Sequence, residues 1–322
     1  MSKAIKIWLI VACALILIGS MIFVGVMALM EWNFSNLSTD KVVENEYEIS
    51  ADLKNIIINS TTADIKILLS EDEKIRIECR ETKKLEHSVY AIDDTLEIIL
   101  NDERKWYEHI QIGVNLSIST VTVYLPKGEY DTLSVKTDTS KVEVAKELCF
   151  GNIGIEVSTG DVDCDASVKG TLKIKASTGD IDVENASVGS LELSASTGKI
   201  TASKIDCEGD INVKASTGKL TLSDVRCNDL ISTGDTGDIT LINVVAAEKF
   251  DINRTTGDVR LEGCDASEIF IVTDTGRVSG SLLSEKVFII KTDTGDVDVP
   301  NSVRGGRCGI TTDTGDIRIT VN

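Results

Sequence analysis

The sequence predicts an all-β fold, a parallel β-helix (β-solenoid) of about 19–20 residues per coil, with an N-terminal transmembrane helix. Three observations predict it. A Thr-Gly turn recurs at a nearly constant interval, apolar and polar residues alternate on both sides of each turn, and an uncharged apolar run precedes the array. The low aromatic content of 4% and the presence of only two prolines also favour many short strands joined by tight turns.

The first element is an apolar segment that is long enough to cross a bilayer. No residue from Ile7 to Met30 is charged, and this run spans about 36 Å as an α-helix. Two lysines precede it, so the positive-inside rule places the N-terminus in the cytoplasm and the remaining chain outside. A cleaved signal peptide is the alternative, but Val26-Met27-Ala28 is a poor cleavage site and the run exceeds a typical signal core. We therefore expect residues 1–30 to form a cytoplasmic tip and a retained single-pass anchor in the cell membrane.

A polar tether (residues 31–45) and an irregular β region that caps the solenoid (residues 46–135) are expected next. Terminal units of solenoids are atypical because they cover an open end. Four strand-like segments lie in the cap, the first with Thr62-Ala63-Asp64 in place of a Thr-Gly-Asp turn: Leu53–Leu69, Ile75–Cys79, Leu96–Leu100 and Leu116–Leu125. The cap also holds six of the twelve aromatic residues outside the anchor, which makes it a candidate ligand surface: Tyr47, Tyr90, Trp106, Tyr107, Tyr124 and Tyr130.

Residues 136–322 form the regular repeat array. Nine turn glycines follow one another at intervals of 19 or 20 residues, each preceded by Thr: Gly160, Gly179, Gly198, Gly218, Gly237, Gly257, Gly276, Gly295 and Gly315. The alternation around each turn, as at Leu172, Ile174 and Ala176, puts one row of side chains inside and the other in solvent. Only glycine adopts a positive φ there without steric cost, and Asn185 and Asn243 lie at a second corner. A single unit cannot bury its apolar row, so each coil must stack on its neighbours.

The eight cysteines do not indicate a metal site. Cys13 lies in the apolar run, no CxxC motif occurs, and the chain has only two histidines. Three cysteines keep a similar spacing before a turn glycine, which suggests small buried side chains inside the coils: Cys149, Cys207 and Cys227. A disulfide between Cys207 and Cys227 remains an alternative, and the seven cysteines outside the anchor cannot all pair within one chain.

Charge excludes two classes of partner. Removing the two N-terminal lysines from the net charge of −19 leaves −21 on the part expected outside the membrane. Such a surface has no basic stripe for nucleic acid, and it would be repelled by anionic lipid headgroups.

The acidic residues at the turns could suggest two kinds of site. Asp-Thr-Gly occurs in aspartic proteases, but here it is one phase of a repeat that elsewhere has Ser-Thr-Gly, and those enzymes need two carboxylates in one cleft. Asp274, Asp293 and Asp313 should stack beside one another, with Asp296 and Asp316 on the other side of the turn. We expect a solvated ladder, with calcium binding as the alternative, because the spacing of a calcium loop is absent.

The sequence presents no catalytic constellation. His87 and His109 are expected at the surface without a nucleophile partner, and the array has almost no aromatic platform on which a sugar could stack. The glycines fall singly at the coil period, which excludes a phosphate or dinucleotide loop. We therefore predict no catalytic, cofactor-binding or metal residue, and no cofactor.

The segments Leu172–Val183 and Val287–Val299 carry alternating aliphatic residues followed by Ser/Asp-Thr-Gly-Asp-Val/Ile-x-Val, and Val121–Pro126 precedes the regular array. With them, most of residues 50–322 resembles a bacterial family of β-strand-repeat candidate adhesins of uncharacterised function. That resemblance implies membrane-anchored proteins associated with envelope stress. We expect a non-enzymatic cell-envelope protein, an adhesin or an envelope-stress accessory or scaffold. Its expected partners are the membrane, through residues 7–30, and envelope proteins or surface glycans. A glycan-active β-helix enzyme of the cell surface is the alternative.

Overall fold

The computed structural model describes residues 3–29, 42–50, 52–104 and 119–322. Among these residues one helix occurs, α1 (Lys3–Leu29), and its part Ile5–Leu29 has a mean hydropathy of 2.8. By length and composition this helix could cross a membrane, as the sequence predicts. Of the expected tether, residues 42–45 belong to the first strand, and the remainder lies outside the described residues.

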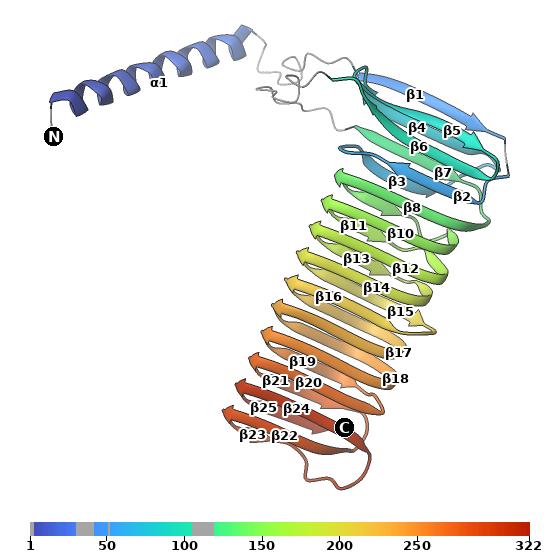
Figure 1. The fold of residues 1–322 in the computed structure, drawn as a ribbon, viewed down its shortest axis with the longest axis vertical. Coiled ribbons are helices and arrows are strands. Elements are labelled where there is room, and N and C mark those ends of the chain that lie inside the picture. Colours follow the sequence, from blue (N-terminus) through green and yellow to red (C-terminus); the bar gives the residue numbers. More distant parts are fainter. Residues whose placement is uncertain (1–2, 30–41, 51, 105–118) are drawn as a thin grey trace.

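The rest of the described chain is a stack of β-coils, confirming the predicted solenoid (Figure 1). Most coils consist of a long strand, a Thr-Gly turn and a shorter strand. The strands are β1 (Val42–Ile49), β2 (Asn55–Asn59), β3 (Asp64–Leu69), β4 (Ile75–Thr82), β5 (Leu85–Ile92), β6 (Thr95–Asp102), β7 (Thr120–Leu125), β8 (Glu129–Thr139), β9 (Val142–Val144), β10 (Cys149–Thr159), β11 (Val162–Cys164), β12 (Ser167–Thr178), β13 (Ile181–Glu184), β14 (Ser187–Thr197), β15 (Ile200–Cys207), β16 (Ile211–Thr217), β17 (Leu220–Thr236), β18 (Ile239–Thr256), β19 (Val259–Cys264), β20 (Glu268–Thr275), β21 (Val278–Leu282), β22 (Lys286–Thr294), β23 (Val297–Asp298), β24 (Gly306–Thr314) and β25 (Ile317–Val321).

The threonine before each turn glycine sets the register of the stack. Thr159 pairs with Thr178, and Thr178 pairs with Thr197, so equivalent residues of successive coils lie directly above one another. The inward rows are aliphatic and almost fully buried, as with Leu172 and Ile174. The core is therefore one continuous column that runs through the coils.

The turn glycines are required for two reasons. Gly179 has a φ of 141°, which L-residues rarely adopt. A Cβ added to it would also lie only 2.0 Å from the carbonyl oxygen of Gly160 in the preceding coil. The sequence indicates the first reason alone. The second follows from the stacking of one turn directly on the next.

The aspartates that follow five of the turn glycines accept a hydrogen bond from the neighbouring coil. Asp161 Oδ1 accepts from the backbone N–H of Asp180 (2.9 Å), and Asp180 Oδ1 from that of Lys199 (2.7 Å). Asp64, in the irregular first turn, binds the N–H of Lys141 in the same way (2.8 Å). These carboxylates are thus structural acceptors, a role that the expected solvated ladder did not include. The same bond recurs at Asp238, Asp258 and Asp316.

The predicted second corner uses left-handed backbone. Asn185 and Asn243 have φ values of 53° and 52°, and equivalent residues of neighbouring coils share this conformation: Lys204, Asp224 and Gly263. Asparagine and aspartate tolerate this region better than most residues because their short side chains bond locally.

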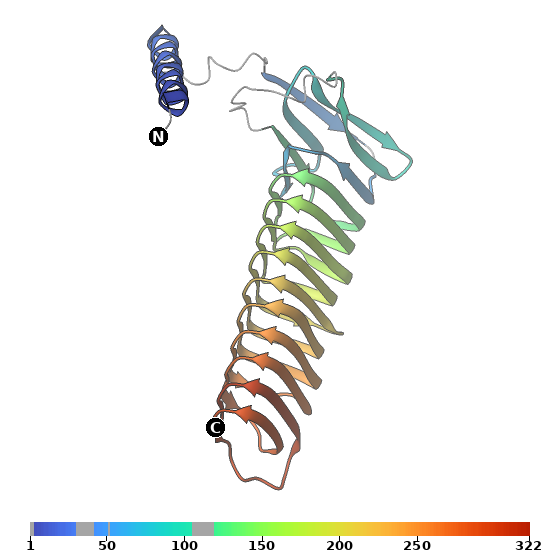
Figure 2. The ribbon, with the colours of Figure 1, turned by 60° about the vertical axis from the view of Figure 1, so that its left-hand side comes forward.

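At both ends the coils stack out of chain order. At the N-terminal end β2 lies between β8 and β6, and β3 lies between β9 and β7. Beyond them, β5 pairs antiparallel with β6, β4 with β7, and β1 with β4; we call this end of the stack the cap. Figure 2 shows this cap at one end of the stack and the C-terminal coils at the other.

At the C-terminal end β24 and β25 insert between the coil of β20 and β21 and the coil of β22 and β23. The turn aspartates Asp274, Asp293 and Asp313 therefore stack beside one another, but in the order Asp274, Asp313, Asp293. The inserted last strand is paired on both edges, which protects a chain end that would otherwise fray. The outermost coil is instead that of β22 and β23.

Candidate functional site

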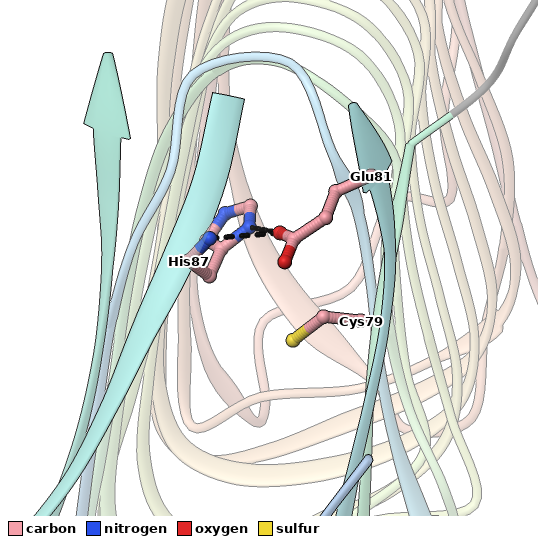
Figure 3. A group of neighbouring side chains, drawn as sticks. All are labelled: Cys79, Glu81 and His87. Carbon is pink, nitrogen blue, oxygen red and sulfur yellow. Dashed lines mark hydrogen bonds and ion pairs between the residues drawn. The ribbon is translucent and has the colours of Figure 1, made fainter. Parts of the chain in front are cut away.

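The cap contains a group of buried polar side chains between its two sheets. Alternation along β4 places Cys79 and Glu81 on the inward row, after Ile75 and Ile77. On β5 the same alternation turns His87 inward. The side chains of Cys79 and Glu81 project from one strand toward His87 on the other (Figure 3). We call Cys79, Glu81 and His87 the cap cluster.

Hydrogen bonds hold the cap cluster in one arrangement. His87 Nδ1 lies 2.7 Å from Glu81 Oε2, and the backbone N–H of His87 donates to the same oxygen (2.8 Å). Asn45 Nδ2 donates to the other carboxylate oxygen (2.9 Å), and Ser60 Oγ lies 3.0 Å from His87 Nε2. Glu81 is only 1% exposed and His87 only 3%. Both oxygens of Glu81 and both ring nitrogens of His87 are therefore engaged.

The electrostatics of the cluster differ between its two acidic groups. Burial and the nearby charge of Glu81 raise the pKa of the Cys79 thiol to about 12, so Cys79 is a neutral thiol. Burial alone would raise the pKa of Glu81, but the hydrogen bonds from His87 and Asn45 outweigh it and hold this pKa below its usual value. The cluster therefore contains one buried carboxylate at neutral pH.

Ser60, His87 and Glu81 contact one another in the order of a serine hydrolase triad. Two features argue against that chemistry. Ser60 is only 8% exposed, so a substrate has little access to its hydroxyl. Its backbone N–H, which could serve an oxyanion hole, donates to the carbonyl of Lys136 (3.0 Å). The arrangement thus orients the imidazole ring and does not present a nucleophile.

The cap cluster offers a thiol sulfur, a carboxylate oxygen and an imidazole nitrogen. All three donor atoms lie within 4.8 Å of one another. Such a set can hold a transition metal. The cysteine count and the two histidines did not indicate it.

Two of the sequence expectations about this region need correction. His87 is buried, so its assignment as a surface residue is wrong. Of the six aromatic residues expected to mark a ligand surface, Tyr130 is buried against Phe150, with ring centroids 5.5 Å apart. Tyr124 lies under the guanidinium of Arg76, 5.2 Å from its ring centroid. Trp106, Tyr107 and His109 lie outside the described residues.

The cysteine expectations largely agree with the structure. Cys207 and Cys227 are buried and free, without the alternative disulfide, whereas Cys149 is partly exposed. A sequence signal for the cap cluster did exist. The alternation from Ile75 continues past Cys79 to Glu81, which puts a charged residue on the row that faces the core.

The family model described as Toastrack DUF4097 matches residues 53–211 and again residues 199–322. The chain belongs to the Toastrack DUF4097 family. This match confirms the resemblance to β-strand-repeat candidate adhesins, and its two successive copies cover nearly all of the β-coils.

Several solved structures are similar to this Toastrack chain. A candidate lipid-binding protein from Parabacteroides distasonis is 16% identical with a TM-score of 0.48, covering 74% of this chain and 96% of its own. A candidate adhesin from the same species is 13% identical with a TM-score of 0.40, and the match covers 85% of this chain and 98% of that protein. A candidate adhesin from Parabacteroides merdae is 14% identical with a TM-score of 0.41, covering 88% and 98%. No curated protein sequence matches the chain significantly.

Proposed function

We propose that this protein is a non-enzymatic adhesin or scaffold of the cell envelope, anchored by α1 and presenting its solenoid outside the membrane. The N-terminus is cytoplasmic in this proposal, because two lysines precede the apolar run. The chain enters the solenoid at the cap, so the coil of β22 and β23 is the far end of the stack from the anchored end. A contact with another surface would be made at that far end.

One observation carries the proposal: an outward column of the long strands ends in apolar residues at the far end of the stack. This column runs through Lys173, Glu192, Asn212, Ile231 and Asp251 and ends at Phe270, Gly309 and Ile289. The adjacent column includes Lys175, Lys214 and Val272 and ends at Lys291 in the outermost coil.

We call Phe270, Val272, Val287 and Ile289 the distal patch. Ile289 is 51% exposed, and Val272 and Val287 are exposed as well. The guanidinium of Arg307 lies over the ring of Phe270, 5.5 Å from its centroid, at the edge of the patch.

Neighbouring exposed apolar side chains on one face mark interaction surfaces, whereas single ones do not. The distal patch is mainly aliphatic, and this favours a protein partner over a glycan, which would stack on aromatic rings. The outermost strand β22 adds an edge: among the described strands it pairs only with β24. Open edges of this kind accept further strands.

The test measures surface attachment in four strains. One lacks the gene, one carries the wild-type chain, one carries the distal double variant Val272→Ser/Ile289→Ser, and one carries the control double variant Lys173→Ser/Lys175→Ser. The control pair lies in the same two columns nearer the cap. We expect the distal pair to lose attachment and the control pair to keep it. Unchanged attachment in both the distal variant and the deletion strain would contradict the adhesin proposal. An envelope-stress reporter that responds to the deletion alone would favour the scaffold role.

A further inference from the structure

The strongest unassigned feature of the described chain is the cap cluster, which lies at the opposite end of the stack from the distal patch. Cys79, Glu81 and His87 are buried on inward rows that elsewhere carry mainly apolar side chains. Burying a carboxylate and an imidazole is costly unless they are paired and hydrogen-bonded, as Glu81 and His87 are. Most coils fill the same rows with apolar side chains, so the solenoid itself does not require such a group.

The geometry points to a binding site for one divalent transition-metal ion of the zinc class, held by Cys79 Sγ, Glu81 Oε2 and His87 Nδ1. Each of the three residues offers one donor atom within 4.8 Å of the other two, and Glu81 Oε2 lies 2.7 Å from His87 Nδ1. A tetrahedral ion with ligand distances of about 2.0–2.3 Å needs donors about 3.2–3.8 Å apart. Shifts of roughly 1 Å or less in these side chains would therefore form the site.

The surroundings already hold two of the three ligands in place. Nε2 of His87 is bound to Ser60 Oγ, so the ring directs Nδ1 toward Glu81. Asn45 holds the second oxygen of Glu81, which leaves Oε2 facing the histidine. Metal-binding histidines and carboxylates are typically oriented by outer partners of this kind.

Charge supports the same assignment. A divalent ion neutralises the Glu81 carboxylate and the thiolate that forms when Cys79 loses its proton to solvent. These two side chains and the ion then carry no net charge, whereas without the ion the site holds one buried carboxylate. The mixture of thiolate, imidazole and carboxylate selects zinc-like ions over magnesium or calcium, which prefer oxygen ligands alone.

The test uses the full chain in detergent, stripped of metal with a chelator and titrated with Co²⁺ as a spectroscopic probe. We expect one equivalent to bind, with a thiolate-to-cobalt charge-transfer band that Zn²⁺ abolishes by displacement. Cys79→Ser should lose this band. Cys227→Ser is the matched control, because Cys227 is also buried and lies near a second cysteine, Cys207. The control should keep the band.

X-ray absorption of the zinc-loaded wild-type chain gives a second measurement that needs no variant. One sulfur and two nitrogen or oxygen ligands from the protein are expected. The proposal is overturned by the absence of stoichiometric binding or by a coordination shell with two sulfurs or none. It is also overturned if the band survives Cys79→Ser and disappears in Cys227→Ser.

Discussion

Gly179→Ala tests the stacked turns most sharply. The new Cβ would lie 2.0 Å from Gly160 O, so the two coils must separate by about 1 Å or more to restore an ordinary contact. The backbone would also be held at a φ of 141°, which costs about 1–3 kcal/mol. Separation weakens the bond from Gly160 N–H to Thr178 O (2.9 Å) and that from Asp180 N–H to Asp161 (2.9 Å), at about 1 kcal/mol each. The expected destabilisation is therefore about 3–5 kcal/mol.

Gly154→Ala is the matched control, because Gly154 lies within β10 and an added Cβ meets nothing within 4 Å. It should change stability by about 0.5 kcal/mol or less, or stabilise slightly. Guanidinium unfolding of the full chain in detergent, followed by circular dichroism, compares the two variants. A midpoint for Gly179→Ala equal to that of Gly154→Ala would refute the role assigned to the stacked glycines.

Three further predictions concern polar groups. Asp180→Ala removes the acceptor of the Lys199 N–H and should cost about 1–2 kcal/mol of unfolding free energy, whereas Asp180→Asn should recover most of it; equal midpoints for the two variants would contradict this. The pKa of Glu81 is lowered in the folded state, so its stabilisation is complete above its unfolded pKa of about 4.3 and is lost as the pH falls through the folded value. Glu81→Gln should therefore cost about 1–3 kcal/mol at pH 7 and less at pH 3, and a difference that is constant across this range would count against the hydrogen-bonded carboxylate. Arg254 is fully buried with one hydrogen bond, to Ala215 O, and its Nε and Nη2 have no partner among the described residues. Arg254→Met should thus increase the free energy of unfolding by about 1–3 kcal/mol and raise the thermal midpoint. A lowered midpoint would show that the hydrogen-bonding groups of the guanidinium are satisfied in the wild-type chain.

The coil architecture was predictable because its determinants are local and repeated. Each turn carries its own Thr-Gly signal, and the alternation around residues such as Leu172 and Ile174 assigns the inward row without knowledge of the neighbours. The register then follows because equivalent residues of successive coils stack on one another, as Thr159 and Thr178 do. The role of the aspartate after glycine was not predictable in this way. It depends on a backbone N–H of the next coil, which only the stack brings within reach.

The order of the end coils could not be predicted from the repeat. The turns at Gly276, Gly295 and Gly315 carry nearly the same residues, so stacking in either order satisfies the same local pattern. The choice depends on the connection 299–305 and on the pairing available to the last strand.

The cap cluster depends on contacts between segments that are separated in the sequence. Its residues come from two antiparallel strands, and its outer partners, Asn45 and Ser60, come from two other parts of the chain. Only the alternation that reaches Glu81 was visible in the sequence.

In-cell photo-crosslinking tests the central claim, that the far end of an anchored solenoid makes the contact. A photo-reactive amino acid would replace Ile289 in the distal patch or, in a parallel strain, Lys173 in the same outward column nearer the cap. The proposal predicts a discrete protein adduct from position 289 and little or none from position 173. Adducts of equal yield from both positions, or an adduct from position 173 alone, would contradict it.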